Sequence, residues 1–443
     1  MNQINKMGNQ KMFPLMVSMA LPPMISMLIQ SLYNIIDSIF VARLSEEALS
    51  AVSIIYPLQN LTLSIAVGAG VGLNSYMARN FGAGNQKDGK NACVIGFIIT
   101  AIHYFLIAGF GVLVMHPFVR FFTQDETVMK LCYDYGYVVM IFCMGQLFHI
   151  TIEKIFQSTG KMLIPMMLQA AGCATNIILD PILIFGLFGM PALGVKGAAI
   201  ATVIGQMVSC LLGVILFLKG KSGVTLPKWK DISFNGAIVK SIYAVAVPST
   251  LIMAFPSILV AGLNGILVGF STLAVSVFGI YYKLQTFVYM PATGLIQGIR
   301  PIISFNYGAG NRKREKEAIR LSLIIIGILM TLGTIFFWCF PTQIMDIFKA
   351  NTEMKEMGVV ALRIISIGFI PSAIGNIASA VFEAMGKGTK SLIITLLRQL
   401  VIVLPIAYAA SRIVGLSGVW IAFPIAEMTA AVYAGTILIK EIR

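Results

Sequence analysis

Three acidic residues interrupt long apolar stretches of this chain: Asp37, Asp180 and Glu427. A charged side chain in hydrocarbon surroundings is expensive, so it is rarely retained there without a function. Asp180 follows Asn176 by one helical turn, and an amide or hydroxyl beside a carboxylate can donate a hydrogen bond to its charged form. We therefore predict a reversible site for a proton or a sodium ion. The alternative is that Asp37 and Asp180 only cap or pin neighbouring helices.

Other polar residues follow the same faces as these acids. Before and at Asp37 they recur three or four residues apart, which places them on one side of a helix: Ser26, Gln30, Tyr33, Asn34 and Asp37. Thr202 and Gln206 are four residues apart in a later segment and form a second polar stripe. Such stripes must face protein or water, so Gln30, Asn34 and Gln206 are predicted to support the ion site.

The composition places these residues in a membrane. Hydrophobic residues make up 58% of the 443 residues and charged residues 11%, with a mean hydropathy of +0.87, whereas soluble domains are about a quarter charged. Twelve apolar runs are long enough to cross about 30 Å of hydrocarbon as helices. They cover roughly residues 14–36, 48–77, 91–115, 131–156, 162–185, 194–218, 240–262, 271–300, 318–340, 355–382, 389–411 and 416–439. We predict an all-α membrane protein with twelve transmembrane helices.

The net charge of +14 is explained by membrane topology and not by nucleic-acid binding. With both termini in the cytoplasm, most lysines and arginines fall in cytoplasmic loops, where anionic lipids attract them. Only Lys283 and Arg398 are then expected inside spans. Lys283 is expected to pair with an acid or to contact a substrate. Arg398 and Glu427 are expected to join helices, and Glu427 could instead belong to a proton path.

No cofactor is predicted. Residues 84–91 fit the phosphate-binding pattern GxxxxGK[ST] except at Asn91, which lacks the hydroxyl that binds magnesium. The segment follows an apolar helix and not a strand, so we interpret it as a tight turn. The six cysteines show no paired spacing typical of metal sites or disulfides. Without an ATP site, any transport by this chain would have to use the gradient of an ion or of the substrate itself.

The second half of the chain repeats the first at a distance of 226 residues. Phe81-Gly-Ala-Gly-Asn85 matches Tyr307-Gly-Ala-Gly-Asn311, and Gly68 and Gly72 match Gly294 and Gly298. This predicts two pseudo-symmetric lobes at residues 1–218 and 240–443, joined by a cytoplasmic linker at 219–239. The glycines are expected to let helices approach closely.

The two copies differ at the acids. Asp37 aligns with Leu263, Asp180 with Leu404 and Thr202 with Phe423. Purely architectural polar groups should be needed in both copies, so their confinement to the first lobe favours a specialised ion site there.

Several elements together resemble the multidrug and toxic compound extrusion (MATE) transporters, and most closely their DinF-like and MepA-like branch. The resemblance rests on the two GAGN turns, Asn34-x-x-Asp37, Asn176-x-x-x-Asp180-Pro181, GVKGAAIAT at 194–202 and GVWIAFPIAE at 418–427. It implies two six-helix bundles that form a V, and a cation site in the first lobe whose positions fall here on Asp37, Asn176, Asp180 and Thr202. The NorM-like branch has acids in its seventh and tenth spans, and this chain has none there.

The resemblance implies an antiporter, not an enzyme, that exports drug-like cationic or amphipathic compounds in exchange for H⁺ or Na⁺. It also implies a monomer in the inner membrane of a bacterium or archaeon, with membrane lipids as its other partners. Two alternatives remain open: a flippase for lipid-linked saccharides, which favours a strongly cationic cavity, and a membrane enzyme, for which the clustered aspartates of a prenyltransferase are missing.

Overall fold

The computed structural model describes residues 3–227, 235–348 and 350–442, and these ranges contain helices and turns without a strand. The helices of the first half are α1 (Gln3–Asn9), α2 (Met12–Ala42), α3 (Glu46–Gly82), α4 (Gln86–Phe122), α5 (Glu126–Ile141), α6 (Met144–Ser158), α7 (Leu163–Phe185), η1 (Leu187–Gly189) and α8 (Val195–Leu218). Those of the second half are α9 (Gly236–Leu267), α10 (Thr272–Gly308), α11 (Arg312–Cys339), α12 (Pro341–Ile347), α13 (Thr352–Ser366), α14 (Phe369–Ala384), α15 (Gly388–Leu396), η3 (Leu397–Val401), α16 (Val403–Val414) and α17 (Leu416–Ile442).

All twelve predicted runs lie on helices. In the described ranges, nine helical segments are long and apolar enough to cross a membrane, and two bent pairs add a further span each. The pairs are α5 with α6, bent by 42°, and α13 with α14, bent by 47°. The twelfth run corresponds to α10, a continuous helix of 37 residues that carries more polar side chains. The predicted twelve-helix fold is therefore confirmed.

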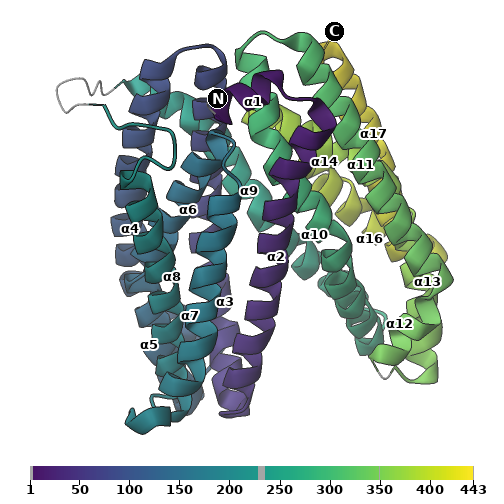
Figure 1. Ribbon diagram of the computed structural model, residues 1–443. Coiled ribbons are helices and arrows are strands. Elements are labelled where there is room, and N and C mark those ends of the chain that lie inside the picture. Colours follow the sequence, from purple (N-terminus) through teal and green to yellow (C-terminus); the bar gives the residue numbers. More distant parts are fainter. Residues whose placement is uncertain (1–2, 228–234, 349, 443) are drawn as a thin grey trace.

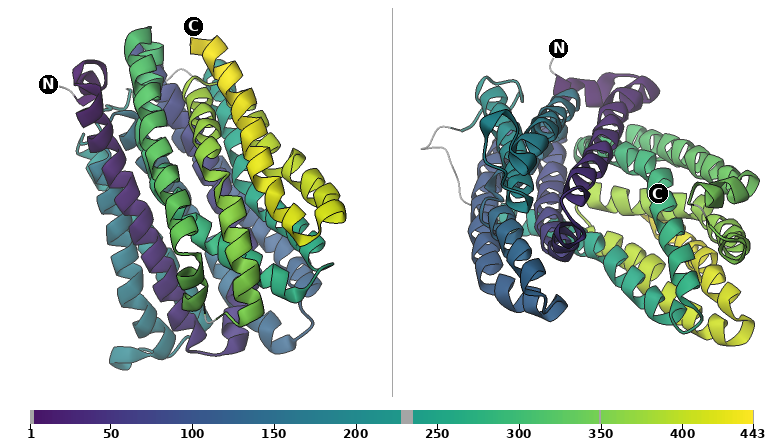
Figure 2. Two further views of the ribbon diagram at one scale, coloured as in Figure 1. Left: turned by 90° about the vertical axis from the view of Figure 1, so that its right-hand side faces the viewer. Right: turned by 90° about the horizontal axis from the view of Figure 1, so that it is seen from below.

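The helices form two bundles arranged as a V, α2 to α8 in one and α9 to α17 in the other (Figure 1). The bundles meet at the end that holds both chain ends and separate toward the opposite end, with α2 running along the gap (Figures 1 and 2). The predicted lobe boundaries at 218 and 240 coincide with the end of α8 and a position inside α9. The predicted linker includes residues 228–234, which lie outside the described residues.

Glycines hold the bundles together at the joined end. A side chain on Gly68 of α3 would come within 2.8 Å of the Ala246 carbonyl oxygen of α9. In the symmetric contact between α10 and α2, one on Gly298 would come within 2.6 Å of the Ala20 Cα atom. Both contacts bring backbone against backbone across the two bundles. The expected close approach at these glycines is confirmed, and it produces the same packing twice.

Hydrogen bonds reinforce this junction. Arg79 at the end of α3 donates from one guanidinium nitrogen to the Ala384 carbonyl oxygen at the end of α14, at 2.9 Å. Ser75 Oγ donates to the same oxygen at 3.0 Å. These bonds satisfy a carbonyl that the helix end leaves without an intrahelical partner. Beside them, Glu383 forms a 2.7 Å salt bridge with Arg300. These hydrogen bonds join the end of α3 in the first bundle to the end of α14 in the second.

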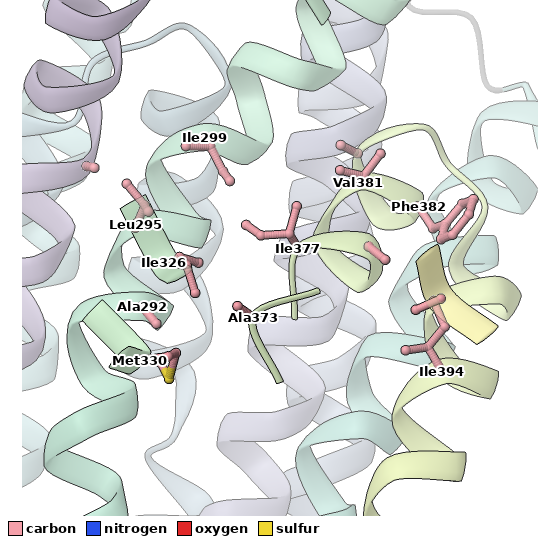
Figure 3. Packing of buried hydrophobic residues seen from close by; sticks show 14 of the residues in the cluster. Ala292, Leu295, Ile299, Ile326, Met330, Ala373, Ile377, Val381, Phe382 and Ile394 are labelled. Atoms are coloured by element: carbon pink, nitrogen blue, oxygen red, sulfur yellow. The ribbon is translucent and has the colours of Figure 1, made fainter. Parts of the chain in front are cut away.

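Each bundle also has an apolar interior. In the second bundle, α10, α11 and α14 interlock through branched aliphatic side chains, including Leu295, Ile326 and Ile377 (Figure 3). These side chains are buried, so the second bundle forms one packed body.

The two GAGN segments form equivalent turns. Gly84 and Gly310 have φ angles of +75° and +67°, a region that glycine adopts without strain. The next residues, Asn85 and Asn311, cap α4 and α11 by accepting hydrogen bonds from backbone N–H groups. The predicted tight turn is therefore present at Gly84 and Asn85, and residues 86–91 form the first turns of α4.

Replacing Gly298 by alanine should separate α10 from α2. The added methyl group meets backbone atoms that cannot rotate away, so we expect a loss of about 1–3 kcal/mol of stability. Thermal unfolding of the detergent-solubilised protein, followed by a thiol-reactive dye that reports exposure of the buried cysteines, measures the effect.

Gly279→Ala is the matched control on the same helix, because a methyl group there meets open space. Removing a mid-helix glycine should leave stability unchanged or raise it by up to about 1 kcal/mol. Equal melting temperatures for the two variants would contradict the proposed role of Gly298.

Candidate functional site

Two carboxyl groups from different helices face each other in the first bundle. Asp37 on α2 and Asp180 on α7 lie close enough for their carboxyl groups to share a hydrogen bond. Asp180 is fully buried, and Asp37 is half-buried with its Oδ1 atom enclosed. The contact exists because α2 and α7 pack side by side along the first bundle. The predicted pairing of the acids is therefore present.

Asn176 and Thr202 complete the predicted set. The Asn176 amide nitrogen donates to Asp180 Oδ1 at 3.3 Å, one turn along α7, and contacts Thr202 Oγ1 of α8 at 3.3 Å. Both residues are buried. The sequence-predicted residues Asp37, Asn176, Asp180 and Thr202 thus come together from three helices. We call this group the acid cluster.

The acid cluster has unbalanced negative charge. Among the described residues, no lysine, arginine or histidine forms a salt bridge with Asp37 or Asp180. Two neighbouring carboxylates in surroundings of low dielectric repel each other strongly, so at least one of them must take up a proton or a cation. This arrangement is suited to reversible cation binding.

Oxygen atoms are available to coordinate a cation. Three buried side-chain oxygens in the acid cluster have no hydrogen-bond partner: Asp37 Oδ1, Asp180 Oδ2 and Asn176 Oδ1. Carboxylate, amide and hydroxyl oxygens are the ligands that hard cations prefer. The described residues contain no group of three or more His, Cys, Asp and Glu side chains that could hold a metal ion. The donor set fits Na⁺ or a proton better than a transition metal.

Two tyrosines and a glutamine extend the acid cluster. The Tyr33 hydroxyl, one turn before Asp37, is within hydrogen-bonding reach of Thr202. Tyr135 of α5 lies near both acids and accepts a 3.3 Å hydrogen bond from Gln59 Nε2 of α3. Tyr33 belongs to the polar stripe seen in the sequence. Tyr135 and Gln59 were not predicted as site residues, because their position beside the acids depends on how α3 and α5 pack against each other.

Three supporting residues lie elsewhere. Asn34 is exposed on α2, and Gln206 is half-buried with no side-chain hydrogen bond to another described residue. Gln30 lines a separate cavity of about 50 Å³. Within the part of the chain that the structure describes, no side-chain hydrogen bond joins Asn34 to the acid cluster, so its supporting role stays a prediction.

The cavity at Gln30 has an acidic residue in its wall. Glu153 lies in its wall and forms a 2.9 Å salt bridge with Lys154, whose side chain is 4% exposed. Lys154 also contacts Gln297 of α10 at 3.3 Å, so it joins the two bundles. Only Lys283 and Arg398 were expected inside spans, and Lys154 must be added to them.

The remaining predicted charges have different environments. Lys283 is exposed on α10 and forms no salt bridge with a described residue, so its expected pairing with an acid is not observed. Arg398 and Glu427 form a two-pronged ion pair at 2.7 and 2.9 Å that joins η3 to α17. Their predicted role in joining helices is confirmed.

Comparisons with known proteins agree with this architecture. The MatE family model matches residues 22–182 and 246–409. A protein described as an FAD transporter from Shewanella oneidensis (strain MR-1) is 27% identical over 417 residues, which cover 93% of this chain and 91% of the relative. Multidrug export protein MepA from Staphylococcus aureus (strain MSSA476) is 26% identical over 433 residues, covering 95% and 92%.

A solved structure resembles the whole molecule. It is described as the outward-facing conformation of a multidrug resistance MATE family transporter of the MOP superfamily. Its TM-score is 0.92 at 26% identity, with 100% of this chain and 99% of that chain covered.

Asp37→Asn and Asp180→Asn should each weaken cation binding at least about tenfold, because each removes one of the two negative charges. Equilibrium uptake of radioactive sodium and proton uptake by the unbuffered, detergent-solubilised protein measure this. Asp134→Asn is the matched control, since Asp134 precedes Tyr135 on α5 and makes no salt bridge with a described residue.

If the two aspartates only pin helices, the asparagine variants will melt at lower temperature while uptake stays at the level of Asp134→Asn. That outcome would contradict a cation site.

Proposed function

The chain belongs to the MatE family of transporters, and on this premise we propose that it is a secondary antiporter that exports cationic or amphipathic compounds in exchange for H⁺ or Na⁺. The observation that carries the proposal is the acid cluster, in which the buried Asp180 lies beside the half-buried Asp37 without a basic partner among the described residues. Such a pair binds a cation reversibly, and a transporter can couple that binding to a change of shape.

The proposed coupling acts through α2. This helix carries Asp37 toward its far end and packs against α10 near its beginning, where Ala20 meets Gly298. It contains Pro22 and Pro23, which remove backbone hydrogen bonds and permit bending. Neutralising the acid cluster removes the repulsion between α2 and α7. The first bundle can then repack, and the two bundles rock about the junction of α3 with α9 and α2 with α10.

The orientation proposed for the molecule follows from its shape. The V is closed at the end with the chain ends and open at the other (Figure 1). The similar solved structure is described as outward-facing. We propose that the closed end lies in the cytoplasm of a bacterium or archaeon and that the open end faces outward across its inner membrane, with one chain as the working unit and membrane lipids around it. The basic loop residues at the closed end suit anionic headgroups.

The proposed substrates are cationic because the acid cluster is the main unbalanced charge described above, and MepA is named as a multidrug exporter. The flippase alternative requires a strongly cationic cavity. A cavity of about 250 Å³ in the second bundle holds one arginine, Arg398, and Glu427 neutralises it. This favours drug export over transport of anionic lipid-linked saccharides. Neither Lys283 nor Glu427 is needed for the proposed ion coupling.

In proteoliposomes, the wild-type protein should move a fluorescent cation such as ethidium when a proton or a sodium gradient is imposed. The two gradients are applied separately, which identifies the coupling ion. Asp37→Asn and Asp180→Asn should slow gradient-driven transport at least about tenfold, because the driving ion no longer binds.

Asp134→Asn should transport at the wild-type rate and controls for the charge change. Absence of ethidium movement under both gradients, with the wild-type protein folded and inserted, would overturn the proposed efflux function.

A further inference from the structure

A second cavity lies in the other bundle and plays no part in the proposed ion coupling. Its volume is about 250 Å³, somewhat below the 300–1,000 Å³ typical of small-molecule sites. It is lined mainly by α10, with further residues from α9, α14, η3, α16 and α17, and Met27 of α2 contributes from the first bundle. A cavity of this size accommodates about two or three fused rings, alone or as part of a larger molecule.

Arg398 forms part of the cavity wall, and the local helix geometry places it there. This residue lies in the π-helical turn η3, where the extra residue brings Arg398 and its neighbour Gln399 to the same cavity. Gly375 of α14 leaves the space that the arginine stem fills, since a side chain there would come within 2.8 Å of Arg398 Cδ. A π turn weakens helix geometry, and such turns are frequent at functional sites.

The cavity is polar without being charged. Arg398 is 5% exposed and donates to both oxygens of Glu427 and to Asn376 Oδ1, at 2.7 to 2.9 Å. A guanidinium has five N–H groups, so two remain after these three bonds. Its charge is cancelled while donors are still available. A charged ligand would lose its hydration here without meeting an unpaired opposite charge, whereas a neutral acceptor could be bound.

Further polar atoms and aromatic rings in the cavity wall indicate which chemical group the cavity would bind. The side chains of Gln399 and Asn376 each have a buried atom without a partner, the acceptor Oε1 and the donor Nδ2. The walls include the rings of Tyr289 and Phe423. Tyr289 is fixed by a 2.8 Å hydrogen bond to Ser372 Oγ and by edge contact with Phe369. Fixed rings next to amide groups match a flat ring system with polar edges.

We propose that this cavity is a binding site for an uncharged, planar heteroaromatic group that carries carbonyl and N–H groups on its edge. The rings of the ligand lie between the aromatic side chains, and its edge contacts Arg398, Gln399 and Asn376. If the chain is the antiporter proposed above, the cavity is a substrate site separate from the acid cluster. Met27 in its wall and Asp37 are ten residues apart on α2, about 15 Å along the helix.

Equilibrium binding of lumichrome tests the proposal. Lumichrome is an uncharged three-ring compound with carbonyl and N–H groups on one edge, and proflavine is a three-ring cation of similar size without carbonyls. Quenching of ligand fluorescence by the purified protein in nanodiscs gives the dissociation constants without any gradient. We expect lumichrome to bind at least about tenfold more tightly than proflavine.

Three variants test whether lumichrome binds in this cavity. Thr286→Trp fills it and should weaken lumichrome binding at least about tenfold. Thr429→Trp is the matched control, because both threonines are exposed and donate only to a backbone carbonyl one turn earlier. Gln399→Leu removes the unpartnered amide acceptor at little change in size and should weaken binding several-fold.

The proposal is overturned if Thr286→Trp and Thr429→Trp bind lumichrome equally, or if proflavine binds as tightly and responds to the same variants. Because binding is measured at equilibrium, it is independent of ion coupling. Lumichrome binding that persists in Asp37→Asn, or in a wild-type protein that moves no ethidium, would separate a failure of the efflux proposal from a failure of this one.

Discussion

Uncompensated negative charge between Asp37 and Asp180 is the constraint on which the first bundle depends. The two carboxyl groups lie on adjacent helices in surroundings that screen charge poorly, and no salt bridge from the described residues balances them. In the proposed mechanism, a proton or a cation bound between Asp37 and Asp180 lowers their repulsion, and movement of α2 away from α7 does the same. The same electrostatic energy would then link cation binding to the position of the helix, which is the basis of the proposed coupling.

The two halves of the chain repeat the same helical framework but carry different side chains at the positions of the acids. Where the first bundle has Asp37 and Asp180, the second has Leu263 and Leu404, and Leu404 packs against Gly262 beside a fully buried Leu263. The ion site is replaced there by close apolar packing. The polar groups of the second bundle sit instead in η3 and α17, where Arg398 and Glu427 neutralise each other. The acids of the first bundle, Asp37 and Asp180, thus have no basic partner among the described residues, whereas Arg398 and Glu427 of the second bundle neutralise each other.

The sequence predicted the features that depend on hydrophobicity and on the repeat. The twelve spans, the glycine contacts at Gly68 and Gly298 and the acid cluster all follow from local residue patterns. The sequence did not predict Lys154 inside a span, because its burial depends on partners from α6 and α10. Nor could it predict the cavity at Arg398, since a π turn has no residue signature and depends on how α14 and α17 pack around it.

In the proposed mechanism, both the acid cluster and the cavity at Arg398 act on the bending of α2, because this helix contributes a residue to each. Ala20, Met27 and Asp37 lie on this one helix, at the junction with α10, in the wall of the cavity and in the acid cluster. From Ala20 to Asp37 the helix rises by about 25 Å, so no direct contact joins the outer two. A bend at Pro22 and Pro23 would shift Met27 and Asp37 together relative to Ala20, which is held by backbone contact with Gly298. Ion and ligand then need not compete for the same carboxylates, because each acts on a different part of one moving helix.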